Sequence, residues 1–455
     1  MGNSIIKPSI LSGFMELLPD EQRVFDDMKK VLEEVFASYG FYGLDTPVLE
    51  RSSVLLAKGG GETEKQVYRF QKGDSDLSLR FDLTVPLAKY VALHYNDLTF
   101  PFRRYQIGKV YRGERAQRGR FREFYQADID VIGDGKLDIV NEAEIPAIIY
   151  RTFTELGLKN FKIHINNRKL LNGFYDMNGM LSRASLIMRT VDKLDKIGPE
   201  KVREILMSPE VGMYAQKADS VLEFTAVKGD NEDVFRYLEQ MRGTDAQYDE
   251  GLDELHTIVQ CLEDLGVPQE NYTIDLSIAR GLDYYTGTVY ETIITSHPEI
   301  GSVCSGGRYD NLAEYYTNKT LPGVGISIGL TRLFYVLNEQ NMLSDTIITS
   351  PCDVLVIPMM EDRSFAMTAA ARFRQSDIRT QFYAEQKKFK AKMSYADKLK
   401  VPFAVILGED EAESNVYSVK NMRTGEQVKL APEEAVAYVQ QELEKMNQGR
   451  LILDD

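Results

Sequence analysis

The sequence predicts a mixed α/β protein with an antiparallel core, a helical insertion and a separate C-terminal α/β domain. Residues 103–133 have the pattern of two strands joined by a loop, residues 168–254 are helical and charged, and strands alternate with helices between residues 353 and 446. The 455 residues are enough for two or three domains. We therefore expect a core of residues 1–167 and 256–338, an insertion of residues 168–255, a linker of residues 339–350 and a last domain of residues 351–455.

The composition is that of an ordinary globular protein, with 43% hydrophobic and 27% charged residues. No apolar run approaches the length that a membrane-spanning helix needs, so we expect no membrane segment. The first residues lack the basic start, apolar core and cleavage site of a secretory signal. The cysteines, Cys261, Cys304 and Cys352, are far apart and form no metal-binding pair. These features favour a reducing, cytoplasmic location.

The distribution of charge indicates a specific polyanionic partner. A formal net charge of −15 argues against a protein that binds nucleic acid nonspecifically. Residues 109–123 and residues 385–400 nevertheless each carry six lysines or arginines against two acidic residues. Two basic stretches on an acidic chain predict contact with a polyanion at two places.

The N-terminal region begins with an amphipathic helix, which Asp20 caps and Gly40 ends. A strand over residues 41–49 follows, and because it contains Pro47 it belongs at a sheet edge or a bulge. The glycine-rich loop of residues 57–63 lacks the Gly-Lys-Ser/Thr ending of a phosphate-binding P-loop. We interpret it as a mobile loop near a site.

A further strand over residues 77–83 alternates in polarity and delivers Asp82 and Thr84 just before Pro86. A helix is expected to follow it. Much later, at the end of the insertion, residues 244–254 have the pattern of an exposed helix or loop.

The most informative strand covers residues 120–131, whose side chains alternate between an apolar and a polar face. The polar face carries Arg120, Arg122, Phe124, Gln126, Asp128 and Asp130. The preceding strand places Arg112 and Glu114 on one face. A solvated hairpin also has a polar face, but this order offers arginines for phosphate, a ring for stacking and an acidic end for an amine or an imidazole. We expect a half-buried strand whose polar face binds a ligand.

A second informative stretch covers residues 272–294. Ile274, Leu276 and Ile278 share one strand face, and the next position on that face is Arg280. Two interpretations remain open, because the arginine either extends its charge from a strand end into solvent or serves a site.

Residues 322–333 have the pattern of a glycine-rich strand that leads into a helix carrying Arg332. The Gly-x-Gly pattern is consistent with phosphate binding and equally with close packing of backbone against backbone. Farther on, the alternation of strand and helix over residues 353–446 predicts a mostly parallel sheet. No glycine fingerprint accompanies it, so we do not expect a dinucleotide site there.

These stretches together resemble one known family. The segment RGRFREFYQADID, residues 118–130, is similar to motif 2 of the class II aminoacyl-tRNA synthetases, and in particular to the histidyl-tRNA synthetase family. Residues 278–291 and 303–312 resemble the two histidine motifs of that family, and residues 323–333 resemble class II motif 3. The N-terminal helix with its proline-containing strand resembles motif 1, which forms the dimer interface of class II enzymes. The resemblance implies a class II antiparallel sheet flanked by helices, a helical insertion and a C-terminal anticodon-binding domain.

The resemblance also implies roles in ATP binding and catalysis. Arg112 would bind the α-phosphate, Glu114 the adenine amino group and Phe124 the adenine ring, while Arg120 and Arg332 would hold the outer phosphates. The catalytic residues would be Arg112 and Arg280, the latter spanning the histidine carboxylate and the α-phosphate. Thr331 stands where the family's motif 3 commonly has glutamate, so the support of Arg332 is an open point.

The histidine-binding residues implied by the resemblance are Asp82, Leu83, Thr84, Arg112, Gln126, Asp130, Arg280, Tyr284 and Tyr285. Of these, Asp82, Thr84 and Gln126 would bind the α-amino group. Asp130 and Tyr285 would hydrogen-bond the imidazole nitrogens. The pocket would therefore reject substrates that lack these nitrogens.

Contacts with tRNA would come from two places. Arg115 and Gln117 would face the acceptor end from the motif 2 loop, and Lys387 and Lys388 belong to the second basic stretch. The implied protein is a homodimeric ligase that converts L-histidine and ATP, with Mg²⁺, to histidyl-adenylate and pyrophosphate. It would then transfer histidine to the 3′ end of histidine tRNA. No metal ligand is predicted.

Three other interpretations fit the sequence less well. A histidine-sensing paralogue, the regulatory subunit of ATP phosphoribosyltransferase, does not aminoacylate; such paralogues typically lack the anticodon-binding domain and part of the arginine set, whereas this chain has Arg280 and a C-terminal domain. A synthetase-like tRNA sensor would be joined to a kinase, and no HRD or DFG signature is present. An unrelated nucleotide-binding scaffold would not explain polar residues at three strand ends.

Overall fold

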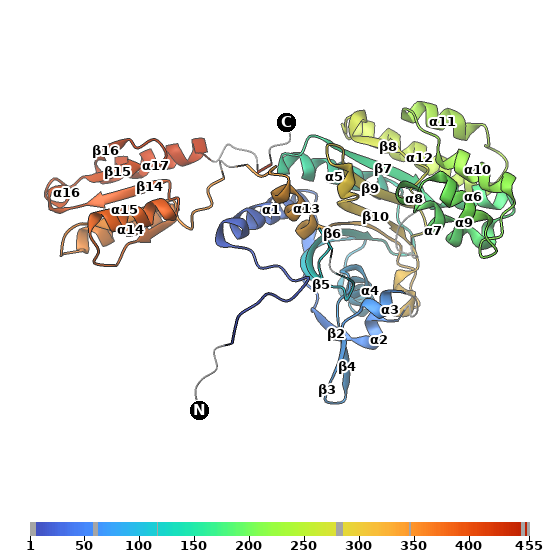
Figure 1. The fold of residues 1–455 in the computed structure, drawn as a ribbon, viewed down its shortest axis with the longest axis horizontal. Helices are drawn as coiled ribbons and strands as arrows, with labels where there is room; N and C mark the ends of the chain where they lie inside the picture. The colour runs from blue at the N-terminus through green and yellow to red at the C-terminus, as the bar shows by residue number, and fades with distance from the viewer. Residues whose placement is uncertain are drawn as a thin grey trace. The chain divides into compact units, whose positions relative to one another are not determined.

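The computed structural model describes residues 6–57, 62–115, 117–278, 285–344, 347–446 and 451–452. They form two compact units, one built on Lys29–Met342 and the other on Leu343–Leu453 (Figure 1). The segment Leu17–Met28, which contains the first part of helix α1 (Pro19–Ser38), groups with the second unit. Within the described ranges, no helix is long and apolar enough to cross a membrane.

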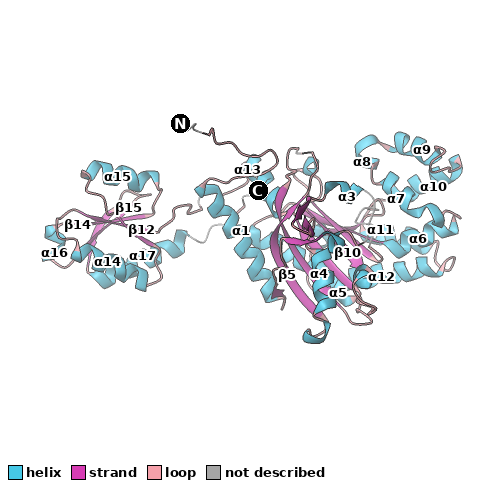
Figure 2. Cartoon of the chain, turned by 90° about the horizontal axis from the view of Figure 1, so that it is seen from below, coloured by secondary structure: helices cyan, strands magenta, loops and turns pink. Residues whose placement is uncertain are grey.

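The first unit is organised around an eight-stranded sheet with the order β1-β5-β6-β11-β10-β9-β7-β8. Its strands are β1 (Tyr42–Gly43), β5 (Phe102–Tyr111), β6 (Glu123–Ile132), β11 (Gly323–Ile328), β10 (Cys304–Tyr309), β9 (Thr288–Ile294), β7 (Phe161–Asn167) and β8 (Tyr272–Ile274). The outer pairs β1–β5 and β7–β8 are parallel, and the other neighbours are antiparallel. Helices flank this sheet (Figure 2), which confirms the predicted fold class.

Helix α5 (Val140–Leu156) packs against the sheet face opposite the polar face of β6. It is rich in buried aliphatic residues, and its fully buried Glu142 forms an ion pair with Arg308 of β10. Gly307 lies on the same face of the sheet as Asp130 of β6. Successive strand residues point to opposite faces, so Arg308 and the helix that pairs with it lie on the other face. The sheet is therefore covered on one side, and both faces of β6 are buried from Gln126 to Ile132. The prediction that only one face of this strand is buried is therefore wrong.

Residues 41–49 do not form the single strand that the sequence predicts. β1 ends at Gly43 and pairs with β5, whereas β2 (Leu49–Arg51) belongs to a separate three-stranded sheet of order β2-β4-β3. That sheet is completed by β4 (Ser75–Leu79) and β3 (Arg69–Lys72), and the short helices α2 (Ser52–Leu55) and α3 (Glu62–Gln66) lie beside it in the sequence. Pro47 falls between the two strands, because its missing N–H cannot take part in a ladder. Residues 58–61 of the predicted glycine loop lie outside the described residues.

The region that the sequence assigns to an insertion is helical. Its helices are α6 (Arg168–Met177), α7 (Ala184–Val191), α8 (Leu194–Ile197), α9 (Pro199–Met207), α10 (Ala215–Thr225), α11 (Asn231–Glu239) and α12 (Ala246–Asp264). A Cβ atom on Gly173 of α6 would clash with the backbone of Tyr248 in α12, so glycine permits these helices to cross closely. Of the exposed helix or loop predicted for residues 244–254, the helix is confirmed from Ala246, but Tyr248 and Leu252 are fully buried, so the segment is exposed on one face only. The domain boundaries themselves stay predictions.

Strand β8 ends earlier than expected. It stops at Ile274, and a turn follows in which the Asp275 carboxylate accepts hydrogen bonds from the N–H and the hydroxyl of Ser277. Leu276 and Ile278 are buried but do not continue a strand face. Arg280 lies outside the described residues, so the choice between its two interpretations stays open.

The second unit contains a five-stranded sheet of order β13-β12-β14-β15-β16. Its strands are β12 (Val354–Pro358), β13 (Thr380–Phe382), β14 (Phe403–Leu407), β15 (Tyr417–Asn421) and β16 (Gln427–Leu430). Its helices are α14 (Ser364–Gln375), α15 (Phe389–Lys398), α16 (Glu409–Glu413) and α17 (Pro432–Met446). Two strand pairs are parallel and two are antiparallel, so the sheet is mixed and not mostly parallel as predicted.

Candidate active site

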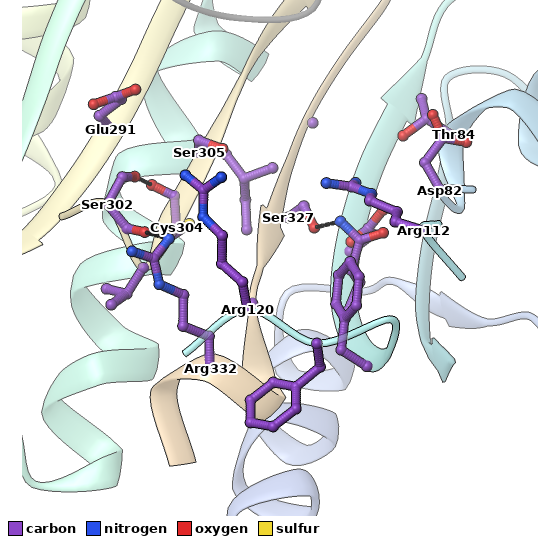
Figure 3. A pocket seen from close by; sticks show the side chains of 18 of the residues that line it. Asp82, Thr84, Arg112, Arg120, Glu291, Ser302, Cys304, Ser305, Ser327 and Arg332 are labelled. Carbon is purple, nitrogen blue, oxygen red and sulfur yellow. Dashed lines mark hydrogen bonds between the residues drawn. The ribbon is translucent and has the colours of Figure 1, made fainter. Parts of the chain in front are cut away.

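A cavity of about 370 Å³ opens on the polar face of β6 and its neighbours β11 and β10 (Figure 3). Ten of the predicted site residues line it: Asp82, Thr84, Arg112, Glu114, Arg120, Phe124, Gln126, Asp130, Tyr285 and Arg332. Segments far apart in the chain thus meet at one cavity. Arg280 and Tyr284 lie outside the described residues, so the structure does not place them.

The register of the sheet explains how distant polar residues come together. Asp128 of β6 faces Ser327 of β11, which faces Ser305 of β10, which faces Glu291 of β9. Residues paired across neighbouring strands point to the same side of a sheet. One polar row therefore crosses four strands on the cavity side.

In the neighbouring row of paired residues, β11 and β10 have glycines at the positions where the row of Asp128 has serines. Asp130 faces Gly325, and Gly325 faces Gly307. A Cβ atom on Gly325 would clash with the Asp130 carboxylate, and one on Gly307 would lie 3.0 Å from the Tyr285 ring. Of the two interpretations left open for the Gly-x-Gly pattern, the structure supports close packing of backbone, because a Cβ on Gly325 would also clash with the Ile129 carbonyl oxygen.

Asp130 is held by two buried partners. The Tyr309 hydroxyl donates to its Oδ1 at 2.6 Å, and the fully buried Arg104 lies 2.8 Å from its Oδ2. Burial raises the pKa of Asp130, and the Arg104 charge opposes that rise. A carboxyl fixed in this way can present a defined acceptor to a ligand.

The segment before helix α4 (Thr84–Leu93) contributes a second buried carboxyl. Asp82 accepts a hydrogen bond from the Val85 N–H at 3.0 Å, which satisfies one of the open donors at the start of the helix. Burial raises the pKa of Asp82, and nearby Arg112 opposes this. Leu83 does not line the cavity. Its side chain is fully buried and its carbonyl accepts a hydrogen bond from Arg104, so it supports the site from behind.

Arg112 follows β5 and lies between two aromatic rings. Its guanidinium carbon is 4.4 Å from the ring centre of Phe81 and 5.1 Å from that of Phe124, and its Nε donates to the Phe81 carbonyl. Cation–π contacts of this kind orient a guanidinium without neutralising it. In Figure 3 Arg112 lies with Asp82 and Thr84, across the view from Arg120 and Arg332.

Arg332 projects from helix α13 (Leu330–Glu339) and donates to the backbone carbonyls of Ser302 and Ile300. The preceding Thr331 is buried, and its hydroxyl accepts a hydrogen bond from the Tyr125 N–H of β6 at 2.8 Å. At this point β11 no longer pairs with β6, so the threonine satisfies an N–H that the sheet leaves open. A threonine can therefore join α13 to the site where the family commonly has glutamate.

The loop between β5 and β6 carries Arg115 and Gln117, and neither lines the cavity. Gln117 and Arg120 pair through their backbones, and Arg120 lies 3.8 Å from Glu114. Arg118 forms an ion pair with Glu339 of α13 at 2.9 Å. The loop thus places Arg120 in the cavity while Arg115 and Gln117 are exposed.

Several lining residues were not assigned from the sequence. They are Gly119, Phe121, Asp128, Glu291, Ser302, Val303, Cys304, Ser305, Tyr309, Gly325, Ile326, Ser327 and Gly329. Asp128 could have been found, because it alternates with Gln126 and Asp130 on the polar face of β6. Glu291 and Ser327 carry no comparable signal, since they join the site only through the strand register.

The second basic stretch lies in the C-terminal unit. Lys387 and Lys388 are exposed, as predicted for a surface that contacts a polyanion. Lys392 is buried, and its Nζ donates to the Pro358 carbonyl at 2.6 Å. One of the six lysines therefore stabilises the unit and is removed from the predicted surface.

Comparison with known proteins agrees with this geometry. The profile of the family described as histidyl-tRNA synthetase matches residues 13–333, and that of an anticodon binding domain matches residues 353–442. A histidine--tRNA ligase of Clostridium tetani is 53% identical over 96% of this chain and 99% of its own length. One from Finegoldia magna is 46% identical over 95% of this chain and 99% of its own length.

A solved structure gives the same result in three dimensions. The crystal structure of histidyl-tRNA synthetase from Nostoc sp. PCC 7120 covers 96% of this chain and 100% of its own, with 37% identity and a TM-score of 0.89. The alignment spans both units. From its sequence, its fold and the residues that line its cavity, the chain belongs to the histidyl-tRNA synthetase family of class II aminoacyl-tRNA synthetases.

Proposed function

We propose that the cavity of Figure 3 activates L-histidine with ATP and passes the histidyl group to the 3′ end of histidine tRNA. One observation carries the proposal: a single cavity has an arginine end with Arg120 and Arg332 and, across the view of Figure 3, a carboxyl end where Asp82 lies beside Arg112. The arginine end suits the phosphates of ATP, and the carboxyl end suits the nitrogens of histidine.

In the first step an oxygen of the histidine carboxylate attacks the α-phosphorus of ATP, and pyrophosphate leaves. Two anions must approach each other, and negative charge develops on the α-phosphate oxygens. Arg112 supplies positive charge there, and we assign Arg280 to the same task, so the enzyme acts mainly by positioning and electrostatic stabilisation. Arg120 and Arg332 hold the outer phosphates. Phe124 stacks on the adenine, and Glu114 accepts from its amino group.

Specificity for histidine comes from the carboxyl end. Asp130 and Tyr285 hydrogen-bond the imidazole nitrogens, and Asp82, Thr84 and Gln126 hold the α-amino group. A site built on such hydrogen bonds rejects analogues that lack them by factors on the order of 10⁴, because its buried polar groups would be left unpaired.

Mg²⁺ would accompany ATP. Within the described ranges, no cluster of three or more His, Cys, Asp or Glu side chains could hold a metal by itself. ATP-bound Mg²⁺ commonly needs only one or two carboxylates besides phosphates and water, and Glu291 lines the cavity. Its carboxylate would hold the ion together with the phosphates. When bound, the ion would shield the phosphate charges.

The second step needs tRNA. We assign the exposed Arg115 and Gln117 of the motif 2 loop to the acceptor end, and the exposed Lys387 and Lys388 of the C-terminal unit to a second tRNA contact. We propose that the chain acts as a homodimer in the cytoplasm, where ribosomes consume aminoacyl-tRNA. In support of the dimer, the stretch that resembles motif 1 has three exposed large apolar side chains, namely Tyr42, Val48 and Leu49.

Histidine-dependent exchange of pyrophosphate into ATP, measured with purified protein, tests the first step. We expect exchange only with histidine, and we expect Arg280→Ala to stay folded and lose most of it. Histidine-independent exchange would refute the substrate. Transfer of labelled histidine to tRNA separates this enzyme from a histidine-sensing paralogue, which would bind histidine and charge no tRNA. Light scattering of the same preparation tests the dimer.

A further inference from the structure

Asp128 is a buried carboxyl of the cavity to which the proposed function gives no role. It lies on β6 between Gln126 and Asp130, lines the cavity and is 2% exposed. Its Oδ1 is buried and has no hydrogen-bond partner among the described residues. Buried polar atoms in native proteins are nearly always paired, so an unpaired acceptor on a residue that lines the cavity points to a donor on the ligand.

The surroundings of Asp128 fix the direction of the neighbouring hydrogen bonds. The Gln126 Nε2 donates to the Ser327 hydroxyl at 2.8 Å, and Ser327 faces Asp128 across the paired strands β6 and β11. A hydroxyl that accepts this hydrogen bond still has its own proton, which it can donate to the Asp128 carboxylate, since an ionised carboxylate can only accept. The amide nitrogen donates to Ser327, so the Gln126 Oε1, which is also buried and unpaired within the described chain, is left as an acceptor on a residue that lines the cavity.

In the described part of the chain, the cation that acts on Asp128 is already paired with another carboxyl. Arg104 of β5 forms its ion pair with Asp130, and Asp82 contributes further negative charge from the segment before α4. Burial raises the pKa of Asp128 to about 7, with the Arg104 charge opposing the rise and Asp130 adding to it. Three buried carboxyls, Asp82, Asp128 and Asp130, thus lie close enough to influence one another, and a ligand cation would relieve their repulsion.

We propose that Asp128 is a further specificity-determining residue, whose carboxylate binds the α-ammonium group of histidine jointly with the Gln126 amide oxygen and is oriented by Ser327. The inference rests on the proposed function and extends it. Alternate residues of a strand point to one side about 7 Å apart, a spacing that an ammonium group bridges with one hydrogen bond to each side chain. The ammonium has three N–H donors, so it can serve both acceptors and still donate to Thr84 or Asp82.

The test compares histidine with its deaminated analogue, 3-(imidazol-4-yl)propionate, by calorimetric titration of the full chain. Asp128→Asn keeps the shape and removes the charge. We expect the preference for histidine over the analogue to fall about 10- to 100-fold in Asp128→Asn, because the ammonium loses a charge-assisted hydrogen bond. The matched control is Asp134→Asn, an exposed carboxyl just beyond the same strand, which should leave the preference unchanged.

The outcomes separate the inference from the function on which it rests. Failure of the unaltered protein to bind histidine would overturn the proposed function. Normal binding of histidine with a preference that Asp128→Asn alters by less than twofold would overturn the role of Asp128 alone. Equal losses for both ligands would place Asp128 against the imidazole and would also overturn it. Thermal unfolding of each variant confirms that the comparison is made on folded protein.

Discussion

Arg104 and Asp130 face each other on the paired strands β5 and β6, 2.8 Å apart, with side-chain exposures of 0% and 3%. The arginine touches no ligand in the proposed function, yet it determines where an imidazole-binding carboxyl lies. It also donates to the Leu83 carbonyl, and thereby connects Asp130 to the segment that carries Asp82 and Thr84. One buried cation therefore organises both carboxyls of the histidine pocket.

Removing the Arg104 charge should destabilise the folded protein. We expect Arg104→Met to lower the free energy of unfolding by about 3–5 kcal/mol, because it leaves a buried carboxylate without its partner. Urea unfolding measures the change. Arg103→Met is the matched control on the same strand, since the Arg103–Glu144 pair is partly exposed and should contribute much less. Equal losses in the two variants would contradict the central position given to Arg104, and Asp130→Asn should restore part of the loss in Arg104→Met.

The glycine at position 325 should tolerate no side chain. A Cβ there would clash with the Asp130 carboxylate and the Ile129 carbonyl, so Gly325→Ala must displace β6 or Asp130. We expect a loss of about 1–3 kcal/mol of stability and a raised KM for histidine, with a smaller change in the KM for ATP. Gly329→Ala is the control for stability, because its Cβ would meet nothing nearer than 3.7 Å. Equal KM changes for both substrates would contradict a local effect on Asp130.

Asp128 should make stability depend on pH in the ligand-free protein. Burial raises its pKa from 3.8 to about 7, so the folded protein retains a proton that the unfolded chain loses between those values. The folded state is therefore favoured at low pH, and this advantage is lost as the pH rises through the folded pKa. We expect Asp128→Asn to raise the unfolding temperature by several degrees at about pH 8 and much less at about pH 5. A gain that is independent of pH would show that Asp128 is ionised throughout.

Local patterns were sufficient for much of the fold. The amphipathic pattern before Gly40 predicts the N-terminal helix, and α1 covers Pro19–Ser38, because this helix carries its own periodic pattern and ending residue. The alternation on β6 likewise predicts the polar face that lines the cavity. Such features depend on neighbours a few positions away, which the sequence displays directly.

Features that depend on pairing between distant strands could not be predicted from local patterns. Arg104 has the pattern of a hairpin charge, and only the register with β6 brings it to Asp130. The local pattern predicts a single strand that contains Pro47, whereas the chain before and after Pro47 pairs in two different sheets. The role of Thr331 also requires the point at which β11 ends beside β6. Each case is decided by which strands meet, and no local pattern contains that information.

The exposed lysines near helix α15 should contribute to tRNA binding through charge alone. Lys387, Lys388 and Lys390 are exposed, whereas Lys392 is buried against Pro358 and must be left intact. Replacing the three exposed lysines by alanine should weaken tRNA binding and lower the slope of log affinity against log salt by about 2–3, one for each lost phosphate contact.

The control for that experiment replaces Lys429 and Lys445, which are exposed in the same unit and paired with Glu411 and Glu442. It should leave the salt slope nearly unchanged, because each side chain already has a carboxylate partner. Pyrophosphate exchange should stay normal in both sets of variants, since the cavity lies in the other unit. An unchanged slope in the triple variant would remove these lysines from the tRNA surface, and a loss of exchange would mean that the substitutions disturb more than tRNA contact.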